Sequence, residues 1–400
     1  MLVFGGLALA AGLVIGQLEL VGVGVLLITV PLLFAFTVIG SVGRIAHSRT
    51  VLPVRVPAGH DARVMVRVGN SSTTWPIASV FVEDFLPVPL GSEPRYFIGH
   101  LGPRAVRDVT YLVRPAVRGR YSVGPLRVGV SDPLGCVRVT RSVGAPSSLL
   151  VTPRTVPLWE SGRAEGSQGE RSPRRSVIGV GEQDPVPRKY RHGDELRRVH
   201  WRSTAKQGEL MVRRDEQHRR EHSTILLDTR VSAHLGRGRH SSLETAVGAA
   251  ASVAVHLIDR RHELRLHTEC GRMQSTTVSG VLDGLAVTEP STVSGLQDGI
   301  GVLANLRNWP DLVVAVLGAV RPEEATALSH VGGRKTRIAV LCSRAAWPHP
   351  ESLRETVELL TATGWRVLTV SDIDELPHLW KHASASQLAV TGPRLPREGL

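Results

Sequence analysis

The sequence has few aromatic residues and few cysteines. Aromatic side chains make up 4% of its 400 residues, too few for the stacked platforms on which proteins bind single-stranded nucleic acid. The three cysteines, Cys136, Cys270 and Cys342, are scattered and odd in number. This excludes a disulfide framework and fits a reducing compartment. Cys270 and Cys342 fall in runs that predict buried strands, so we expect inert thiols there.

Several motifs of known chemistry are also absent. The chain has no phosphate-binding loop, no nucleophile elbow and no H-E-x-x-H helix. Its 16 histidines are scattered without a convincing metal-ligand spacing. With 42% hydrophobic and 21% charged residues, the composition excludes a disordered chain. The length predicts two or three domains.

Charge is almost absent from residues 1–43, where Glu19 is the only charged side chain. The apolar run Leu20–Gly43 is long enough to cross a bilayer, whereas Leu2–Gly16 is shorter than the roughly 17 residues that a spanning helix needs. A cleaved signal peptide would need a basic start and a small-residue cleavage site, and neither is present. We predict a transmembrane helical hairpin with Gln17–Glu19 at its tip, and the short first span suggests either a misplaced start codon or a few missing N-terminal residues.

Positive charge begins where the second apolar run ends. Arg44, Arg49 and Arg55 follow it, so the positive-inside rule predicts that the rest of the chain is cytoplasmic. Residues 44–150 hold 14 Lys and Arg against 6 Asp and Glu, whereas residues 222–400 hold 18 of each. The net charge of +12 is therefore concentrated near the membrane, where anionic headgroups would attract it. An arginine-rich composition set by a GC-rich genome is the alternative explanation.

The remaining chain divides by pattern. Residues 44–157 alternate apolar and polar residues in short runs separated by Gly, Pro or Asn, which predicts a β-sandwich. Residues 158–188, rich in Gly, Ser, Pro and mixed charges, predict a flexible linker, and residues 189–221 a separate helix–strand segment. Residues 222–380 alternate strand and helix patterns, which predicts an α/β doubly wound domain. Residues 381–400 read as a frayed tail.

One segment between the linker and the α/β domain is distinctive. It reads YRHGDELRRVHWRSTAKQGELMVRR over Tyr190–Arg214 and is called the signature segment below. Gly193 and Asp194 offer a turn and an N-cap for a helix over Glu195–Lys206. A strand over Glu209–Arg213 follows. The segment therefore predicts a short helix with a strand after it.

The signature segment has two interpretations. Asp194 and His200 suit a general acid–base pair, but such a pair needs a substrate cleft and the sequence shows none. A packing or docking motif is the preferred interpretation. We expect Trp201, beside Val199 on the short helix, to be buried against the α/β sheet.

The signature segment resembles that of the bacterial family catalogued as domain of unknown function 58. The positions that match the pattern of that family are Tyr190, Gly193, Asp194, Arg197, His200, Trp201, Thr204, Ala205, Lys206, Gly208, Leu210, Val212 and Arg213. The run Arg118–Val139 resembles the strand pair of the family that ends in a DP-[FL]-G turn. With the membrane hairpin and the α/β region, the resemblance covers nearly the whole chain.

This resemblance carries several implications. It implies a membrane-anchored protein with a β-sandwich and a von Willebrand factor A-like domain. The genes of the family often lie beside genes for MoxR-type AAA+ ATPases and transglutaminase-like membrane proteins, which implies such partners. The docking residues would be Tyr190, Gly193, Asp194, Arg197, His200, Trp201, Thr204 and Gly208.

A von Willebrand A-like domain usually binds a divalent cation through D-x-S-x-S after its first strand, and hard oxygen ligands suit Mg²⁺. Here the motif reads Asp228-Thr229-Arg230-Val231-Ser232. Asp228 and Ser232 fit, but Arg230 replaces the first Ser with a fixed positive charge, and no Asp follows the strand at Asp311–Val320. Candidates for the Thr ligand are Thr276, Thr277 and Thr292. We expect a degenerate site without a cofactor, in which Asp228 pairs with Arg230 or caps the next helix.

The sequence thus predicts a protein-interaction or assembly factor of the inner (plasma) membrane, multi-pass, with its C-terminal domains in the cytoplasm. It would act with a MoxR-type AAA+ ATPase in cell-envelope or complex maturation. One alternative is a hydrolase that uses Asp194 and His200, or a metal at Asp228. Another is a phospholipid or nucleic-acid binder acting through the basic half, although the scarcity of aromatic residues argues against nucleic acid.

Overall fold

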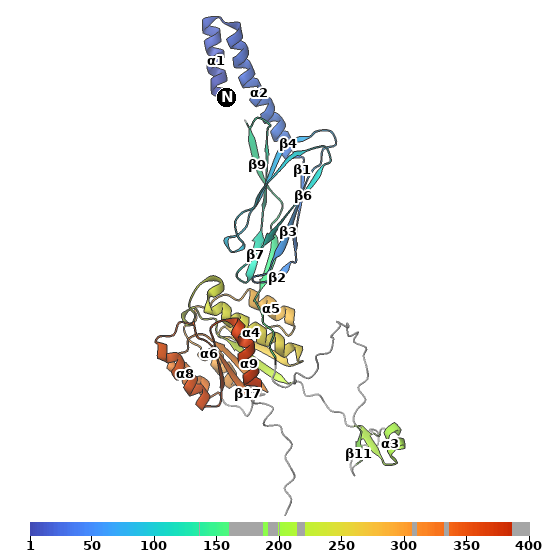
Figure 1. Cartoon of the computed structure of the whole chain (residues 1–400), viewed down its shortest axis with the longest axis vertical. Coiled ribbons are helices and arrows are strands. Elements are labelled where there is room, and N and C mark those ends of the chain that lie inside the picture. Colours follow the sequence, from blue (N-terminus) through green and yellow to red (C-terminus); the bar gives the residue numbers. More distant parts are fainter. Residues whose placement is uncertain are drawn as a thin grey trace, which may run out of the picture.

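The computed structural model describes residues 1–135, 137–159, 187–190, 199, 201–213, 221–305, 310–331 and 336–385. Along the chain lie an N-terminal pair of apolar helices, an all-β region and an α/β domain (Figure 1). A small strand–helix–strand unit lies in the sequence between the β region and the α/β domain.

The N-terminal helices are α1 (Leu2–Ile15) and α2 (Leu18–Val42). Glycine lets them approach closely, because a Cβ on Gly12 would lie 2.7 Å from the backbone nitrogen of Val21. Glu19, expected at the tip of the hairpin, instead lies in the first turn of α2. Among the described residues, α2 alone is long and apolar enough to cross a membrane. The 14 residues of α1 rise only about 21 Å, less than the apolar core of a bilayer.

The β region consists of three sheets around one hydrophobic core. Its strands are β1 (Ile45–Leu52), β2 (Arg55–Pro57), β3 (Ala62–Asn70), β4 (Ile77–Asp84), β5 (Arg95–Leu101), β6 (Val106–Val113), β7 (Gly119–Val123), β8 (Leu126–Ser131), β9 (Arg138–Val143) and β10 (Ser147–Thr152). The strand orders are β1-β3-β6, β2-β10-β7 and β5-β4-β8-β9. Alternation sets the faces, since β3 buries Ala62, Val64, Val66 and Val68 while its arginines face outward.

The last turn of α2 is part of the β core. Val38 and Val42 are buried in the same cluster as the strands, and α2 packs beside β8 and β9. Figure 1 shows α2 running straight into the β region. The helix and the β region therefore form one continuous body.

The α/β domain contains a six-stranded sheet of order β15-β14-β13-β16-β17-β18, parallel except for the edge strand β15. The strands are β13 (His222–Leu227), β14 (Glu263–Thr268), β15 (Gly271–Met273), β16 (Leu312–Leu317), β17 (Thr336–Cys342) and β18 (Arg366–Val370). The helices are α4 (Ser242–Asp259), α5 (Val278–Ala286), α6 (Gln297–Ala304), α7 (Pro322–Ser329), α8 (Pro350–Ala362) and α9 (Leu376–Ala385). Helices α4, α5 and α9 cover one face of the sheet, and helices α6, α7 and α8 cover the other.

Local rules explain several of these boundaries. Ser241 caps α4, because its hydroxyl accepts from the backbone N–H of Leu243. Pro322 begins α7, a position that suits the fixed φ of proline. Helix α9 continues to Ala385, beyond the point where the tail was expected to begin. The chain builds β13, β14 and β15 outward in one direction and then β16, β17 and β18 in the other, so the strand order reverses between β13 and β16.

A buried arginine joins the β region to the α/β domain. Arg118, just before β7, donates through Nε to the carbonyl of Leu285 at 2.9 Å and through Nη2 to the carbonyl of Thr288 at 2.8 Å. Its third group, Nη1, pairs with the carboxylate of Glu244 in the first turn of α4. At the edge of this domain contact, Arg55 pairs with Asp283 of α5 at 2.6 Å. The two domains are thus linked by charge-assisted bonds.

Candidate functional site

Strands β13 and β16 end side by side at the carboxyl edge of the sheet, where the strand order reverses. In open α/β sheets, ligands bind in the crevice at such a point. Asp228 follows β13, and its backbone N–H donates to the carbonyl of Val316 at 2.9 Å. Gly318 follows β16, and its N–H donates to Oδ2 of Asp228 at 3.3 Å. The Asp228 carboxylate therefore lies, fully buried, at the point where the strand order reverses.

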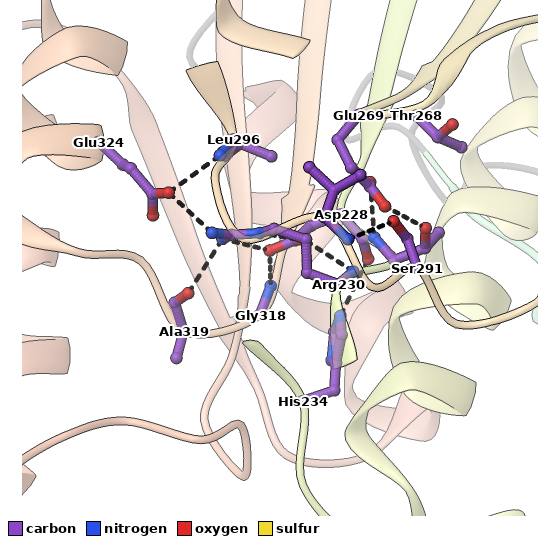
Figure 2. A network of polar contacts seen from close by, with 12 residues as sticks. Asp228, Arg230, His234, Thr268, Glu269, Ser291, Leu296, Gly318, Ala319 and Glu324 are labelled. Atoms are coloured by element: carbon purple, nitrogen blue, oxygen red, sulfur yellow. Dashed lines mark hydrogen bonds and ion pairs between the residues drawn. The ribbon is translucent and has the colours of Figure 1, made fainter. Parts of the chain in front are cut away.

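The side chain of Arg230 fills this position (Figure 2). It is 1% exposed. Nε and Nη2 donate to the two carboxylate oxygens of Asp228, each at 2.9 Å, and Nη1 donates to Oε1 of Glu324 at 2.7 Å. Nη2 also donates to the carbonyl of Ala319 at 3.2 Å. The predicted ion pair between Asp228 and Arg230 is confirmed.

The electrostatics of this cluster keep Arg230 charged. Burial acts to lower the pKa of Arg230, but the hydrogen bonds and charges of Asp228 and Glu324 outweigh it and leave that pKa above its ordinary value. A permanent cation thus lies between two buried carboxylates. The guanidinium performs the neutralising role that a metal ion would have at such a position.

Glu324 is the member of the cluster that sequence reasoning missed. It lies in the first turn of α7, where Oε2 accepts from the backbone N–H of Arg321 at 3.0 Å and Oε1 from that of Leu296 at 2.9 Å. No Asp follows β16, as the sequence indicated, and this glutamate supplies the second carboxylate from the next helix. The pattern that marks it is an acid three residues after the N-cap, the spacing of a capping box.

A further carboxylate holds the other side of the same loop. Glu269 follows β14, is buried, and accepts from the N–H and the hydroxyl of Thr229 at 3.0 and 2.5 Å. Ser291 closes the loop, since its carbonyl accepts from Val231 and its N–H donates to Thr229, both at 2.8 Å. The loop that carries Arg230 is therefore fixed from both sides, as Figure 2 shows.

The residues present do not fit a Mg²⁺ ion. Both carboxylate oxygens of Asp228 already accept from Arg230. Ser232, the second expected ligand, is exposed in the 3₁₀ turn Val231–Ala233, whereas Asp228 is fully buried. Thr277, one of three threonines considered as a ligand, instead caps α5. In the part of the chain that the structure describes, no group of three or more His, Cys, Asp or Glu side chains is placed to hold a metal.

The two cysteines considered above differ in their surroundings. Cys342 is buried in β17 as predicted, and burial raises the pKa of its thiol to about 12. The prediction for Cys270 is wrong, because β14 ends at Thr268 and Cys270 lies exposed in the turn after it. Its Sγ is 3.2 Å from Oγ of Ser291.

His234 contacts the loop that carries Arg230. Its Nε2 donates to the carbonyl of Asp228 at 2.9 Å, and its Nδ1 is 3.1 Å from Oγ of Ser242. Because a carbonyl only accepts, this geometry requires a proton on Nε2, and in the neutral ring Nδ1 accepts from the hydroxyl of Ser242. Burial lowers the pKa of His234, against the opposing influence of Asp228.

Acidification is expected to destabilise the α/β domain through His234. Because its pKa is lowered by folding, the unfolded chain binds the proton first as pH falls. The stabilisation is present above the ordinary pKa of about 6.5 and is lost as pH falls below it towards the folded pKa. The free energy of unfolding, measured by urea denaturation of the full chain above and below that pH, should fall less in His234→Gln than in the parent.

Two further variants complete this experiment. Burial also lowers the pKa of His267, so the double variant with His267→Gln should have the flattest pH profile. His60→Gln, which changes an exposed histidine of the β region, should keep the slope of the parent. If His234→Gln kept that slope too, the assigned ring protonation would be contradicted.

The described part of the signature segment forms a small unit, called the signature unit below. Strand β11 (Pro187–Lys189) pairs antiparallel with β12 (Met211–Arg213), and α3 (Trp201–Gln207) lies between them in the sequence. Oγ1 of Thr204 accepts from the backbone N–H of Met211 at 3.0 Å. Gly208, with a φ of 73°, ends the helix in a conformation that favours glycine. Two of the expected docking residues thus have local structural roles.

The expectation that Trp201 is buried is wrong. The side chain is 70% exposed, while Val199 and Met211 are the buried apolar residues of the segment. Among the α3 side chains whose burial is described, Thr204 is partly buried and Trp201 is exposed. Gly193, Asp194, Arg197 and His200 lie outside the described residues, and so does the start of the helix predicted at Glu195.

Comparison with protein families gives one match. The family model described as "Protein of unknown function DUF58" matches residues 187–345, which take in the signature unit and the α/β domain through β17. The match supports the resemblance to that family over this part of the chain. The curated proteins contain no match.

Several solved structures are similar to part of the chain. A solution NMR structure of the CARDB domain of PF1109 from Pyrococcus furiosus has 18% identity and a TM-score of 0.21, over 27% of this chain and 94% of that one. A crystal structure of the same domain in complex with di-metal ions has 17% identity, a TM-score of 0.19, and coverage of 27% and 84%. Spo0M, a sporulation control protein from Bacillus subtilis, has 12% identity, a TM-score of 0.17, and coverage of 27% and 49%. Function does not transfer at these values.

Proposed function

We propose that the chain is a membrane-anchored protein-interaction factor whose α/β domain is a von Willebrand factor A-like module that binds its partner without a metal ion. The observation that carries this proposal is the buried Arg230 between Asp228 and Glu324. A guanidinium fills the crevice in which a sheet of this kind would take a substrate or an ion. The carboxyl edge is therefore suited to protein contact rather than to catalysis.

Anchoring rests on α2, which has the length and composition of a spanning helix. In the proposed topology α1 packs on α2 as a second, shorter membrane segment, and residues 44–400 lie in the cytoplasm of the inner membrane. The close packing at Gly12 supports the pairing of the two helices. The arginines after α2 support the orientation.

Exposed apolar side chains supply the contact surface. Val231 and Leu235 follow β13 at the closed carboxyl edge, and both are largely exposed. On the signature unit, Trp201 and Leu210 are exposed as well. Tryptophan is enriched among the residues that dominate binding energy at interfaces. A MoxR-type AAA+ ATPase, implied by the family resemblance, is the proposed partner.

Replacing Trp201 with alanine should leave the fold intact and weaken capture of the ATPase. Loss of an interface tryptophan of this kind costs 2 kcal/mol or more, or about 30-fold in affinity. Affinity purification of the full chain from native membranes, followed by immunodetection of the MoxR-type ATPase, measures this. Trp159→Ala removes a tryptophan that is also exposed, at 59%, and serves as the matched control.

The same purification tests the metal-free mode. Addition of EDTA to the washes should leave the captured ATPase unchanged. Loss of the ATPase with EDTA would contradict a closed, guanidinium-filled site. Equal capture by Trp201→Ala and the parent would remove the signature unit from the interface.

A further inference from the structure

The length of α2 fixes how close the β region lies to the bilayer. The apolar core of a bilayer is about 30 Å thick, which takes roughly 20 helical residues. Counted from Leu18, these reach Thr37. The next residues, Val38 to Val42, are those that pack into the β core. The β region therefore begins within one helical turn of the hydrocarbon boundary.

Three loops and the end of α2 form the end of the β region that faces this boundary. The loops are 71–76 between β3 and β4, 102–105 between β5 and β6, and the described residues 132–135 and 137 between β8 and β9. Arg44, just after α2, accepts at its carbonyl from Ser71, and the carbonyl of Ser72 accepts from Arg104. Figure 1 shows α2 entering between β9 and the loops beside β4. We call these residues the membrane-facing rim.

Two apolar side chains project from the rim. Trp75 is 67% exposed and Leu134 is 63% exposed. Each lies on a loop held by a buried polar residue. Asn70 donates to the carbonyl of Trp75 at 2.8 Å and accepts from Ser72 at 3.0 Å. Both apolar groups are therefore presented to solvent by fixed backbone rather than by a loose loop.

The turn that carries Leu134 is held in the same way. The carboxylate of Asp132 is buried and accepts from the N–H of Leu134 at 3.0 Å and from that of Val137 at 2.6 Å. This explains why a DP-[FL]-G turn occurs here: the Asp closes the turn, and the apolar residue is left at its tip. Packing within the β region does not use Leu134.

The exposed charged side chains of the rim are all positive. Arg104 is exposed and Arg44 is partly so, and Arg138, the first residue of β9 after the rim, is exposed as well. Asp132 is the one acid in the described rim, and it is buried in its turn. An exposed tryptophan with basic neighbours is the composition that proteins place at the lipid headgroups of an anionic leaflet.

We propose that the membrane-facing rim is a lipid-binding surface, in which Trp75 and Leu134 enter the headgroup layer beside α2 and the arginines lie against lipid phosphates. The proposal rests on α2 crossing the membrane, as proposed above. It gives the chain a second attachment to the bilayer besides the helix. With two attachments, the β region has a fixed tilt relative to the membrane. Because the contacts of Arg118 link the β region to the α/β domain, this tilt also sets the orientation of the α/β domain.

Fluorescence quenching by brominated lipid tests the placement of the rim. The full chain is reconstituted into vesicles of phosphatidylglycerol and brominated phosphatidylcholine, in which tryptophans that enter the bilayer lose emission. Trp75→Phe should lose most of the quenchable emission of the parent. Trp159→Phe should retain it, because this tryptophan, 59% exposed, follows β10 beside Leu158, which is buried in the core of the α/β domain.

A rescue variant and a flotation control complete the test. Leu134→Trp introduced into Trp75→Phe should restore quenching through the second loop. A chain that floats with the vesicles but is quenched equally with and without Trp75 overturns the rim proposal and leaves the anchor intact. A chain that fails to float with the vesicles overturns membrane anchoring by α2, and the rim proposal with it.

Discussion

Replacing Arg230 with methionine is expected to destabilise the α/β domain by about 3–5 kcal/mol, the usual cost of removing one partner of a buried ion pair. Asp228 and Glu324 would remain in the interior without their shared cation. For a domain of this size each kcal/mol lowers the melting temperature by roughly 2–4 °C. Differential scanning calorimetry of the full chain in detergent should therefore show a loss on the order of 10 °C.

Two further variants separate lost charge balance from lost packing. Combining Arg230→Met with Asp228→Asn and Glu324→Gln removes all three charges and should recover much of the loss, because no buried charge is then unpaired. Arg230→Lys keeps the charge but cannot make the bidentate contact with Asp228 while also reaching Glu324 and Ala319. It should melt between the parent and Arg230→Met. If Arg230→Met had the same melting temperature as the parent, the cluster would not contribute to the stability of the domain.

Replacing Arg118 with methionine should uncouple the β region from the α/β domain. Truncating one partner of a buried, hydrogen-bonded charge pair typically costs about 2–5 kcal/mol. Here the loss leaves two carbonyls and the carboxylate of Glu244 without their donor. Burial already raises the pKa of Glu244, and Arg118 opposes that rise. Hydrogen exchange in α5 should become faster, and a single calorimetric transition should split into two.

The neighbouring ion pair offers a matched control for this interface. Arg55 pairs with Asp283 close by, but the Arg55 side chain is well exposed. Arg55→Met should therefore change stability by less than about 1 kcal/mol, as exposed pairs do. Adding Glu244→Gln to Arg118→Met should recover part of the loss. Equal exchange rates in α5 for Arg118→Met and Arg55→Met would show that the buried pair does not couple the domains.

Periodicity predicted the elements with strong local patterns and missed those without. The alternation in β3 is visible in a few consecutive residues and is confirmed, and the N-cap of α4 at Ser241 is an equally local feature. Helix α5 has only a weak local pattern, because Gly280 and Gly284 interrupt its nine residues. Its stability comes from Val281 and Leu285, which are buried in the main core of the domain. Such tertiary burial is not visible in a local window.

The candidate site was predictable only where it is local. Asp228 and Arg230 are two residues apart, so their pairing followed from the sequence. Glu324 lies 94 positions beyond Arg230, and only the fold brings it to the guanidinium. For Trp201, a prediction made from local sequence alone was wrong. A short helix with several apolar residues does not specify which of them faces inward, and the unit buries Val199 and Met211 instead.

If α2 crosses the membrane, as proposed above, bilayer thickness becomes a structural variable for this chain, because α2 ends inside the β core. A spanning helix in a bilayer thicker or thinner than its apolar length adjusts by tilting or by deforming the lipid. Most anchors can tilt freely, because a loop separates the helix from the domain that it holds. Here Val38 and Val42 are packed among the strands, so a tilt of the helix must rotate the β region with it. Hydrophobic mismatch would therefore set the angle at which the α/β domain is held above the membrane.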